Sequence, residues 1–494
     1  MTSATHEVAI LLLLVLGGTS LAWFLGFRNA VLLATVGFAL SILMRTSIFL
    51  IFHFFDIAIS SRLAWGAASL VAFLLAALFA RRHQIFWMAL LLAAGLGVIA
   101  FLTKYLLNIG ERFHEDSVQI IGNSILVFSS DGMSSEIKRG LAYPLMLALG
   151  QEDHIFSSFT PLVFLNLLIL SIWTGMRITR RIVEPRVYLL IAMFLVAVSA
   201  TSPMVRTLVF YINSHTMVAL GAALVISGLI LSVHSVRLEP QTFAVIATGS
   251  ILASWARYEG AIVILLALLP FISSELIRTR LQRVNLFAVA ISPAVAWLIW
   301  SIAAGADFRV LSMVTISGPA LWAILGIIAI PLGLWVTPPL DKLRRHTPSI
   351  VGIPLAIFVM FIFEQKLTST SLPAQIRNIF FGLGGWGFVA PAFLLLLVLF
   401  GYAHASREYR KLIGMLALAI PAAFFIKFLD GQAMGRQGFN DSINRSWAHW
   451  LPLFWLIASV GMARIWPWGQ RGTQGMTSLS SRSRVRGRAK NERS

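Results

Sequence analysis

Long uninterrupted apolar runs dominate this chain. Leu63–Ala80, Ile85–Leu107 and Leu383–Gly401 are examples of runs of about 17–25 residues, the length that a helix needs to cross roughly 30 Å of hydrocarbon. Lipid offers the backbone no hydrogen bonds, so such a segment is expected to be an α-helix. A membrane β-barrel would show short segments of alternating polarity instead. The runs therefore predict an all-α, polytopic membrane protein.

The composition agrees with this class and limits the chemistry. Hydrophobic residues make up 58% of the chain and charged residues 12%, about half the charged share of a soluble domain. The absence of cysteine excludes disulfides, thiol catalysis and thiolate metal sites. The net charge of +19 would suggest nucleic acid in a soluble protein. Here most basic residues lie in short connections between apolar runs, so no nucleic-acid partner is expected.

Basic clusters predict the orientation, because short cytoplasmic loops are rich in Lys and Arg. The clusters are Arg81–His83, Arg177–Arg186, Arg278–Arg283, Lys342–Arg345, Arg407–Lys411 and the tail beyond Arg464. Placing all of them in the cytoplasm predicts a bundle of about 13–15 spans, with the N-terminus outside and the C-terminus inside. The expected spans are 8–26, 30–50, 63–80, 85–107, 155–175, 187–202, 215–233, 241–256, 260–276, 285–303, 319–336, 349–364, 383–402, 411–427 and 449–466.

Four regions follow from this topology. We expect N-terminal transmembrane helices over residues 1–104 and an extracytoplasmic loop over 105–154. A transmembrane core with short outer loops follows over 155–466. Residues 467–494 form a basic, disordered cytoplasmic tail that contacts anionic membrane lipids.

The longest outward loop, 105–154, carries the best candidates for chemistry. Two adjacent carboxylates, Glu115 and Asp116, follow His114. Mutual repulsion and poor hydration near lipid make such a carboxylate a better proton acceptor. Lys138 and Arg139, later in the loop, are suited to binding a phosphate. The alternative is a solvated loop whose acids form ion pairs or cap a helix. The His-Glu-Asp spacing is not that of a metal site, so no metal is expected.

A charged pair, Arg257 and Glu259, lies where one expected span ends at the outer surface and the next begins. Such a pair can line a cavity, or it can simply reach toward the interface and form a local ion pair. The residue types leave both interpretations open.

The last outward loop, Lys427–His449, contains Arg436 and Arg445. Cations that face outward break the orientation rule, so they need another reason. Binding an anionic headgroup or a diphosphate is one such reason. The alternative is that the two arginines pair with Asp430 and Asp441.

Together these features resemble the GT-C superfamily of integral-membrane glycosyltransferases, which use polyprenyl-phosphate-linked sugars. His114–Asp116 looks like the superfamily's diacidic motif, and Lys138–Pro144 is similar to the segment that usually follows it. Ala256–Gly260 is similar to the Arg-x-Glu-Gly at the outer end of a middle helix. Arg445–Leu453 looks like the start of a late span, where an Arg precedes Pro-Leu. The motifs are loose, and their order along 105–465 carries the resemblance. The superfamily usually has one span before this loop, whereas four are expected here.

The resemblance implies hexosyl or pentosyl transfer from a polyprenyl-phosphate sugar to a hydroxyl of a glycan, lipid or protein, with inversion. Asp116 or Glu115 would take the proton from the acceptor. The other implied substrate-binding residues are His114, Lys138, Arg139, Tyr143, Arg257, Glu259, Arg436, Arg445 and His449. No cofactor is expected, because polyprenyl-monophosphate users generally need no metal. The implied location is a bacterial inner or plasma membrane, with the active site on the extracytoplasmic side.

Two other functions are compatible with many spans and outward cations. A flippase or exporter of a lipid-linked glycan would carry buried charges along several helices, whereas a transferase would concentrate them at one outer face. The sequence favours the transferase pattern. A polymerase or ligase of the O-antigen type fits less well, because its large outward loop usually comes late in the chain.

Overall fold

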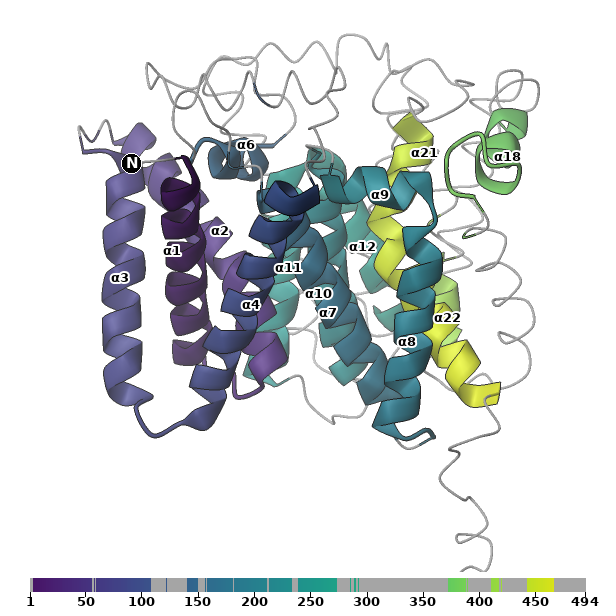
Figure 1. Ribbon diagram of the computed structural model, residues 1–494, viewed down its shortest axis with the longest axis horizontal. Coiled ribbons are helices and arrows are strands. Elements are labelled where there is room, and N and C mark those ends of the chain that lie inside the picture. The colour runs from purple at the N-terminus through teal and green to yellow at the C-terminus, as the bar shows by residue number, and fades with distance from the viewer. Residues whose placement is uncertain are drawn as a thin grey trace, which may run out of the picture.

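The computed structural model describes mainly residues 3–107, 140–149, 156–210, 213–232, 239–272, 372–389, 410–419 and 442–465, apart from isolated positions within these ranges. These residues contain fourteen α-helices and one 3-10 helix, and no strand occurs among them. The prediction of an all-α protein is therefore confirmed (Figure 1).

Most of the helices are long and lie roughly parallel to one another (Figure 1). The described helices, long and short together, are α1 (Ser3–Phe24), α2 (Ala30–Phe54), α3 (Ser61–Phe79), α4 (Gln84–Leu107), α6 (Ala142–Leu147), α7 (Phe159–Thr179), α8 (Pro185–Ala200), α9 (Pro203–Phe210), α10 (His215–Ser232), α11 (Pro240–Ala256), α12 (Tyr258–Ile272), α18 (Leu372–Phe380), α21 (Ser442–Ser446), η3 (Trp447–Trp450) and α22 (Leu451–Ile465).

Six of the described helices, α1, α2, α3, α4, α7 and α10, are long and apolar enough to cross a membrane. A seventh span results if α8 and α9, which meet at an angle of 96°, are one bent span. The chain is thus an integral membrane protein with several spans. The spans expected at 285–303, 319–336 and 349–364 lie outside the described residues.

The expected span at 383–402 does not begin where the sequence predicts. Residues 381–387 form a turn after α18 rather than the first turn of a helix. Gly382, Gly385 and Gly387 have φ values of 76°, 75° and 58°, which glycine adopts without steric cost. A run of apolar residues predicted a helix here, but the glycines within it stabilise a turn.

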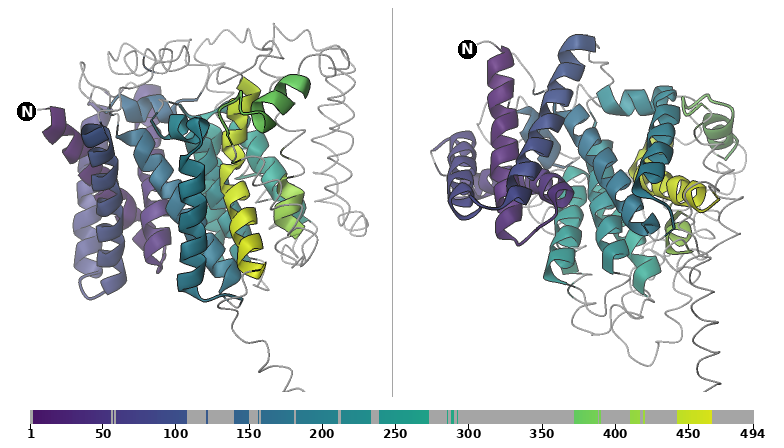
Figure 2. Two further views of the ribbon diagram at one scale, coloured as in Figure 1. Left: turned by 45° about the vertical axis from the view of Figure 1, so that its right-hand side comes forward. Right: turned by 60° about the horizontal axis from the view of Figure 1, so that its bottom comes forward.

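Helix packing places α10 at the centre of the described bundle and α3 at its edge. The apolar window of α10 is 94% buried, and that of α3 is 17% buried. α10 packs along α11 and α7, while α3 packs against α1 and α2 (Figure 2). Small residues permit the close approach of α10 and α11, because a Cβ at Gly221 would lie 2.6 Å from the carbonyl oxygen of Gly249.

Two side-chain hydrogen bonds connect α8 to α22, the last described helix. The Tyr188 hydroxyl donates to Ser459 Oγ at 2.9 Å, and Trp455 Nε1 donates to Ser199 Oγ at 2.9 Å. All four side chains are buried. Hydrogen bonds of this kind are favourable inside a bilayer, where an unpaired polar group has no water to bind.

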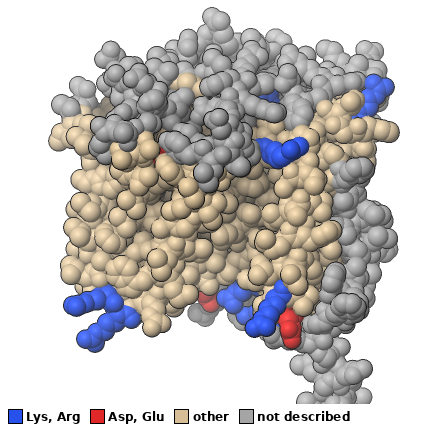
Figure 3. Space-filling model, in the orientation of Figure 1, with Lys and Arg blue, Asp and Glu red and all other residues tan. Residues whose placement is uncertain are grey.

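The described bundle has two chemically different ends. The basic end contains the α1–α2, α3–α4 and α7–α8 connections, and Figure 3 shows exposed Lys and Arg side chains along its edge. Its exposed arginines are Arg28, Arg81, Arg82, Arg177, Arg180 and Arg186. The opposite end contains α6, α9, α21 and the start of α10 (Figure 1). The opposite end has exposed arginines too, Arg206 on α9 and Arg377 on α18, but it differs in that Arg257 and Arg445 are buried there. The side of the membrane that each end faces stays a prediction.

Candidate functional site

A buried polar cluster at the opposite end joins segments that are far apart in the sequence. It contains Ser214 and His215 at the start of α10, Arg257 after α11, and Arg445 and His449 before α22. All five side chains are less than one tenth exposed. Groups of this kind are costly to bury in a membrane protein, so they mark a functional site by default.

Arg257 is positioned by a reversal of the chain between α11 and α12. Its backbone is extended, with φ −157° and ψ 148°, and the chain turns back so tightly that a Cβ on Gly260 would clash with the carbonyl of Ala253. Arg257 is 4% exposed, and its Nη1 donates to Ser214 Oγ at 3.2 Å. The guanidinium therefore lies at the N-terminus of α10. A cation and a helix N-terminus together favour an anionic ligand.

The two histidines of the cluster contact each other directly. His215 Nδ1 and His449 Nε2 are 2.8 Å apart, and the ring centroids lie 4.9 Å apart with a tilt of 31°. His215 is 4% exposed and His449 is fully buried. One nitrogen must donate and the other accept, which fixes the tautomers of the pair relative to each other. The contact connects the start of α10 to η3.

Asn444 holds the short helix α21 in place, next to Arg445. Trp386 Nε1 donates to Asn444 Oδ1 at 2.6 Å, and Asn444 Nδ2 donates to the carbonyl of Gly384 at 2.9 Å. Gly384 is required by this close contact, since a Cβ there would lie 2.6 Å from Asn444 Oδ1. The turn after α18 thus supports the segment that carries Arg445.

The return segment of the long loop lies against the end of α11, next to Arg257. Gly140 has φ 106°, and a Cβ there would clash with the carbonyl oxygen of Ala256 and lie 2.7 Å from that of Trp255. Tyr143 follows in α6 and is fully buried. Its hydroxyl hydrogen-bonds Thr160 Oγ1, and its ring centroid lies 5.3 Å from that of Phe159. Tyr143 therefore packs α6 against α7.

Four predicted site residues, Tyr143, Arg257, Arg445 and His449, lie in the described part of the chain, all at the opposite end. Glu259 lies in the first turn of α12, and its side chain is outside the described set. The predicted residues outside the described ranges are His114, Glu115, Asp116, Lys138, Arg139 and Arg436.

Sequence reasoning missed Ser214, His215, Asn444 and Trp386. A signal was present for His215, because it stands at the start of an apolar run that follows an expected outward segment. For Asn444 the signal was its position next to Arg445. Nothing local indicates Trp386 as its partner.

The two histidines are joined by a hydrogen bond. Among the described residues, no group of three or more His, Asp or Glu side chains could hold a metal ion. Two imidazoles alone fall short of the three protein ligands that catalytic zinc sites use.

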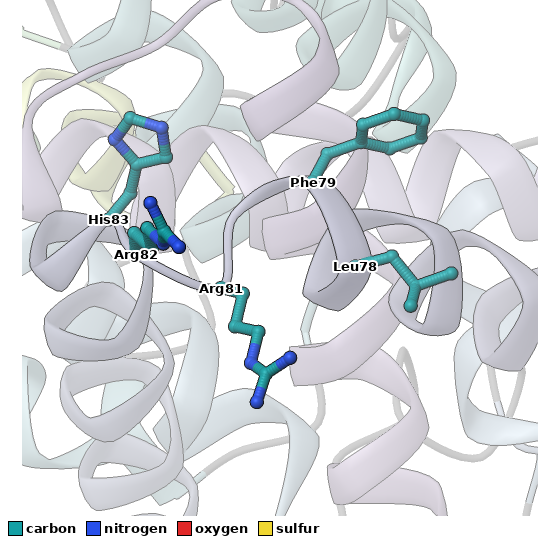
Figure 4. A pocket seen from close by; sticks show the side chains of 5 residues that line it. All are labelled: Leu78, Phe79, Arg81, Arg82 and His83. Carbon is teal, nitrogen blue, oxygen red and sulfur yellow. The ribbon is translucent and has the colours of Figure 1, made fainter.

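A pocket of about 470 Å³ lies at the basic end, at the α3–α4 turn. It is lined by Leu78, Phe79, Arg81, Arg82 and His83. Figure 4 shows that the three basic side chains point in different directions instead of converging on one point. Exposed cations at the end of apolar helices are typical of the membrane surface, so this pocket is not the candidate site.

Comparison of the chain with protein-family models, with curated proteins and with solved structures gives no match. The chain is an all-α integral membrane protein that buries two arginines and a histidine pair at one end of its described helices.

Proposed function

We propose that the protein is a membrane glycosyltransferase that moves a sugar from a polyprenyl-phosphate donor to an acceptor hydroxyl, with inversion. One observation carries the proposal. Three of the segments that resemble the GT-C superfamily, namely 140–144, 256–260 and 445–453, come together at one end of the bundle. Their likeness is loose in the sequence, and an accidental likeness gives no reason for them to meet.

The first role in this proposal is support for the leaving phosphate. Arg257 is buried at the start of α10, and Arg445 is buried in α21, directly before η3, which packs against α10. Charge interactions are screened less in such buried places than in water. Arginine binds phosphate oxygens with paired hydrogen bonds. Stabilising charge where it develops is usually the largest contribution to catalysis. The two arginines are therefore assigned to the polyprenyl phosphate.

The reaction balances without a further reactant. The acceptor oxygen forms a bond to the anomeric carbon while the bond from that carbon to the phosphate oxygen breaks. The acceptor's proton passes to Asp116 or Glu115, which lie outside the described residues. The polyprenyl phosphate leaves with the electron pair. Single displacement inverts the configuration at the anomeric carbon.

The histidine pair is assigned a positioning role. Its hydrogen bond connects α10, which receives Arg257, to η3, which follows Arg445. A shift of either segment would move the two arginines relative to each other. In well-ordered sites such displacements of about 1 Å reduce rates by about 100-fold.

Proteoliposomes test the proposal directly. Purified protein would receive a panel of labelled undecaprenyl- and decaprenyl-phosphate hexoses and pentoses, with membrane glycans and lipids as acceptors. Transfer with inversion is expected from at least one donor. Arg257→Gln and Arg445→Gln should reduce transfer about tenfold or more, whereas Arg186→Gln, an exposed change at the basic end, should not.

The same assay separates the transferase from the flippase alternative. A flippase would bind the labelled lipid and move it between leaflets without forming a glycosylated product. Donor movement without transfer to any acceptor would therefore replace the proposal with that alternative.

A further inference from the structure

A second buried arginine site lies on α2 and α3, apart from the Arg257 cluster. Arg45 of α2 is 2% exposed. Its Nη1 donates to Ser61 Oγ at 3.0 Å, and its guanidinium carbon lies 5.8 Å from the ring centroid of Phe49. Its Nε has no hydrogen-bond partner.

No carboxylate pairs with Arg45 among the described residues. The buried acid near the start of α1, Glu7, instead accepts a hydrogen bond from the backbone N–H of Ser158 at 3.0 Å. A buried cation without a counter-ion is strongly unfavourable, particularly at membrane depth. Among the described residues, no anion therefore balances the charge of Arg45.

The first residues of α3 add positive potential at the same place. Ser61, which accepts from Arg45, is the first residue of α3. The Ser60 side chain makes no capping hydrogen bond, and the first turn of α3 contains no acid. The N–H groups at a helix start carry partial positive charge and bind anions readily. Arg62 follows directly, is half-buried and repels Arg45 electrostatically, and its Nη2 donates to the carbonyl of Leu149 at 3.5 Å.

We propose that Arg45, Arg62 and the N-terminus of α3 form a binding site for a phosphate group, and that an anionic membrane phospholipid supplies it. The site combines two guanidinium groups with helix N–H donors, which suit a phosphate headgroup. None of these residues belongs to the Arg257 cluster.

The surroundings favour a lipid as the source of the phosphate. α3 is the least buried of the candidate spans, so lipid chains can lie against it. Large apolar side chains near its start and at the end of α2 are exposed, including Phe54, Phe55, Ile59 and Leu63. A headgroup phosphate at Arg62 would leave its acyl chains against these side chains, where they exclude water.

Lipid binding to the full-length protein tests the site. Delipidated protein would be placed in nanodiscs of phosphatidylcholine alone, or of phosphatidylcholine with phosphatidylglycerol. Native mass spectrometry would count retained phosphatidylglycerol, and thermal unfolding would measure stabilisation. We expect phosphatidylglycerol to be retained and to raise Tm. Arg62→Gln should weaken its retention about tenfold. Arg206→Gln, an exposed change on α9, should leave it unaltered.

Arg45→Gln and Arg45→Lys give the second comparison. Glutamine removes the charge, so the rise of Tm with phosphatidylglycerol should disappear, whereas lysine should retain part of it. If Arg45→Gln does not fold, Arg62→Gln decides the question, because its side chain is only half-buried. Retention of phosphatidylglycerol that is equal in wild type and Arg62→Gln would overturn the proposal.

A third arm separates the two sources of phosphate. Inorganic phosphate would be titrated against protein in phosphatidylcholine alone. No stabilisation by inorganic phosphate, together with stabilisation by phosphatidylglycerol, supports the lipid. Stabilisation by inorganic phosphate alone, lost in Arg62→Gln, would overturn the lipid source and leave a site for free anions.

Discussion

His215 Nδ1 and His449 Nε2 lie 2.8 Å apart although 234 residues separate them in the chain. The hydrogen bond needs one protonated and one unprotonated nitrogen at the contact. It joins the first residue of α10 to η3, and Arg257 reaches the residue before His215. This contact therefore connects the two arginine-bearing segments directly.

Replacing His449 should reduce both stability and transfer. His449→Ala removes the partner of a buried nitrogen, which costs about 1–3 kcal/mol. His449→Gln keeps a hydrogen-bonding group and should lose less. Thermal unfolding and the transfer rate would be measured for both, with His83→Gln at the basic end as control. Equal Tm values for His449→Ala and wild type would show that the contact does not stabilise the fold.

Gly140→Ala should disturb the junction between α6 and α11. The positive φ of 106° and the clash with the Ala256 carbonyl both oppose a Cβ, and such strain costs about 1–3 kcal/mol. Gly95→Ala is the matched control, because nothing lies within 4 Å of a Cβ there. Denaturation of both variants in the same detergent would compare them. The expectation fails if the two glycine variants are equally stable.

Asp116→Asn should remove the general base while nearly preserving its volume. Loss of a general base typically reduces a rate by about 10²–10⁴-fold. Glu115→Gln should cost less if Glu115 orients the acceptor. Transfer rates at saturating donor would be compared. An unaffected rate for Asp116→Asn would exclude Asp116 as the base. If only Glu115→Gln were inactive, Glu115 would be the base and Asp116 the residue that orients the acceptor.

Arg445→Lys should weaken binding and transfer of the polyprenyl-phosphate sugar, because lysine cannot replace paired guanidinium hydrogen bonds. Arg445→Ala should weaken both more. The loss of a charge-assisted hydrogen bond costs roughly 1.5–3 kcal/mol. Titration of the polyprenyl-phosphate sugar would follow binding and transfer separately, with Arg186→Ala as control. Unchanged donor affinity for Arg445→Ala would remove this residue from the site.

The two loops of the proposed site should face the same side of the membrane. Single cysteines at Ser130 and Gln437 are informative because the chain has none of its own. An impermeant thiol reagent should label both in intact cells. A cysteine at Gln84, beside the α3–α4 turn of the basic end, should react only after permeabilisation. Labelling of only one of the first two would contradict the topology.

Hydropathy predicted the described spans well, because a helix that crosses the membrane must be apolar along the whole thickness of the hydrocarbon layer. α4 begins within one residue of the expected 85–107, and the turn at Arg257 lies where two expected spans meet. The turn at residues 381–387 was missed because hydropathy counts the leucine and the tryptophan among its glycines as apolar. The partner of His449 could not be predicted, because a contact across 234 residues has no local pattern.

The two hydrogen bonds between α8 and α22 also concern how the protein is made. Tyr188 and Ser199 enter the membrane more than 250 residues before their partners are synthesised, since the sequence separations are 271 and 256. Until α22 is synthesised and inserted, Tyr188 and Ser199 lack these partners, and His215 lacks His449. Assembly is therefore a late step of biogenesis. A chain that ends before residue 442 lacks all three of these partners, Ser459, Trp455 and His449.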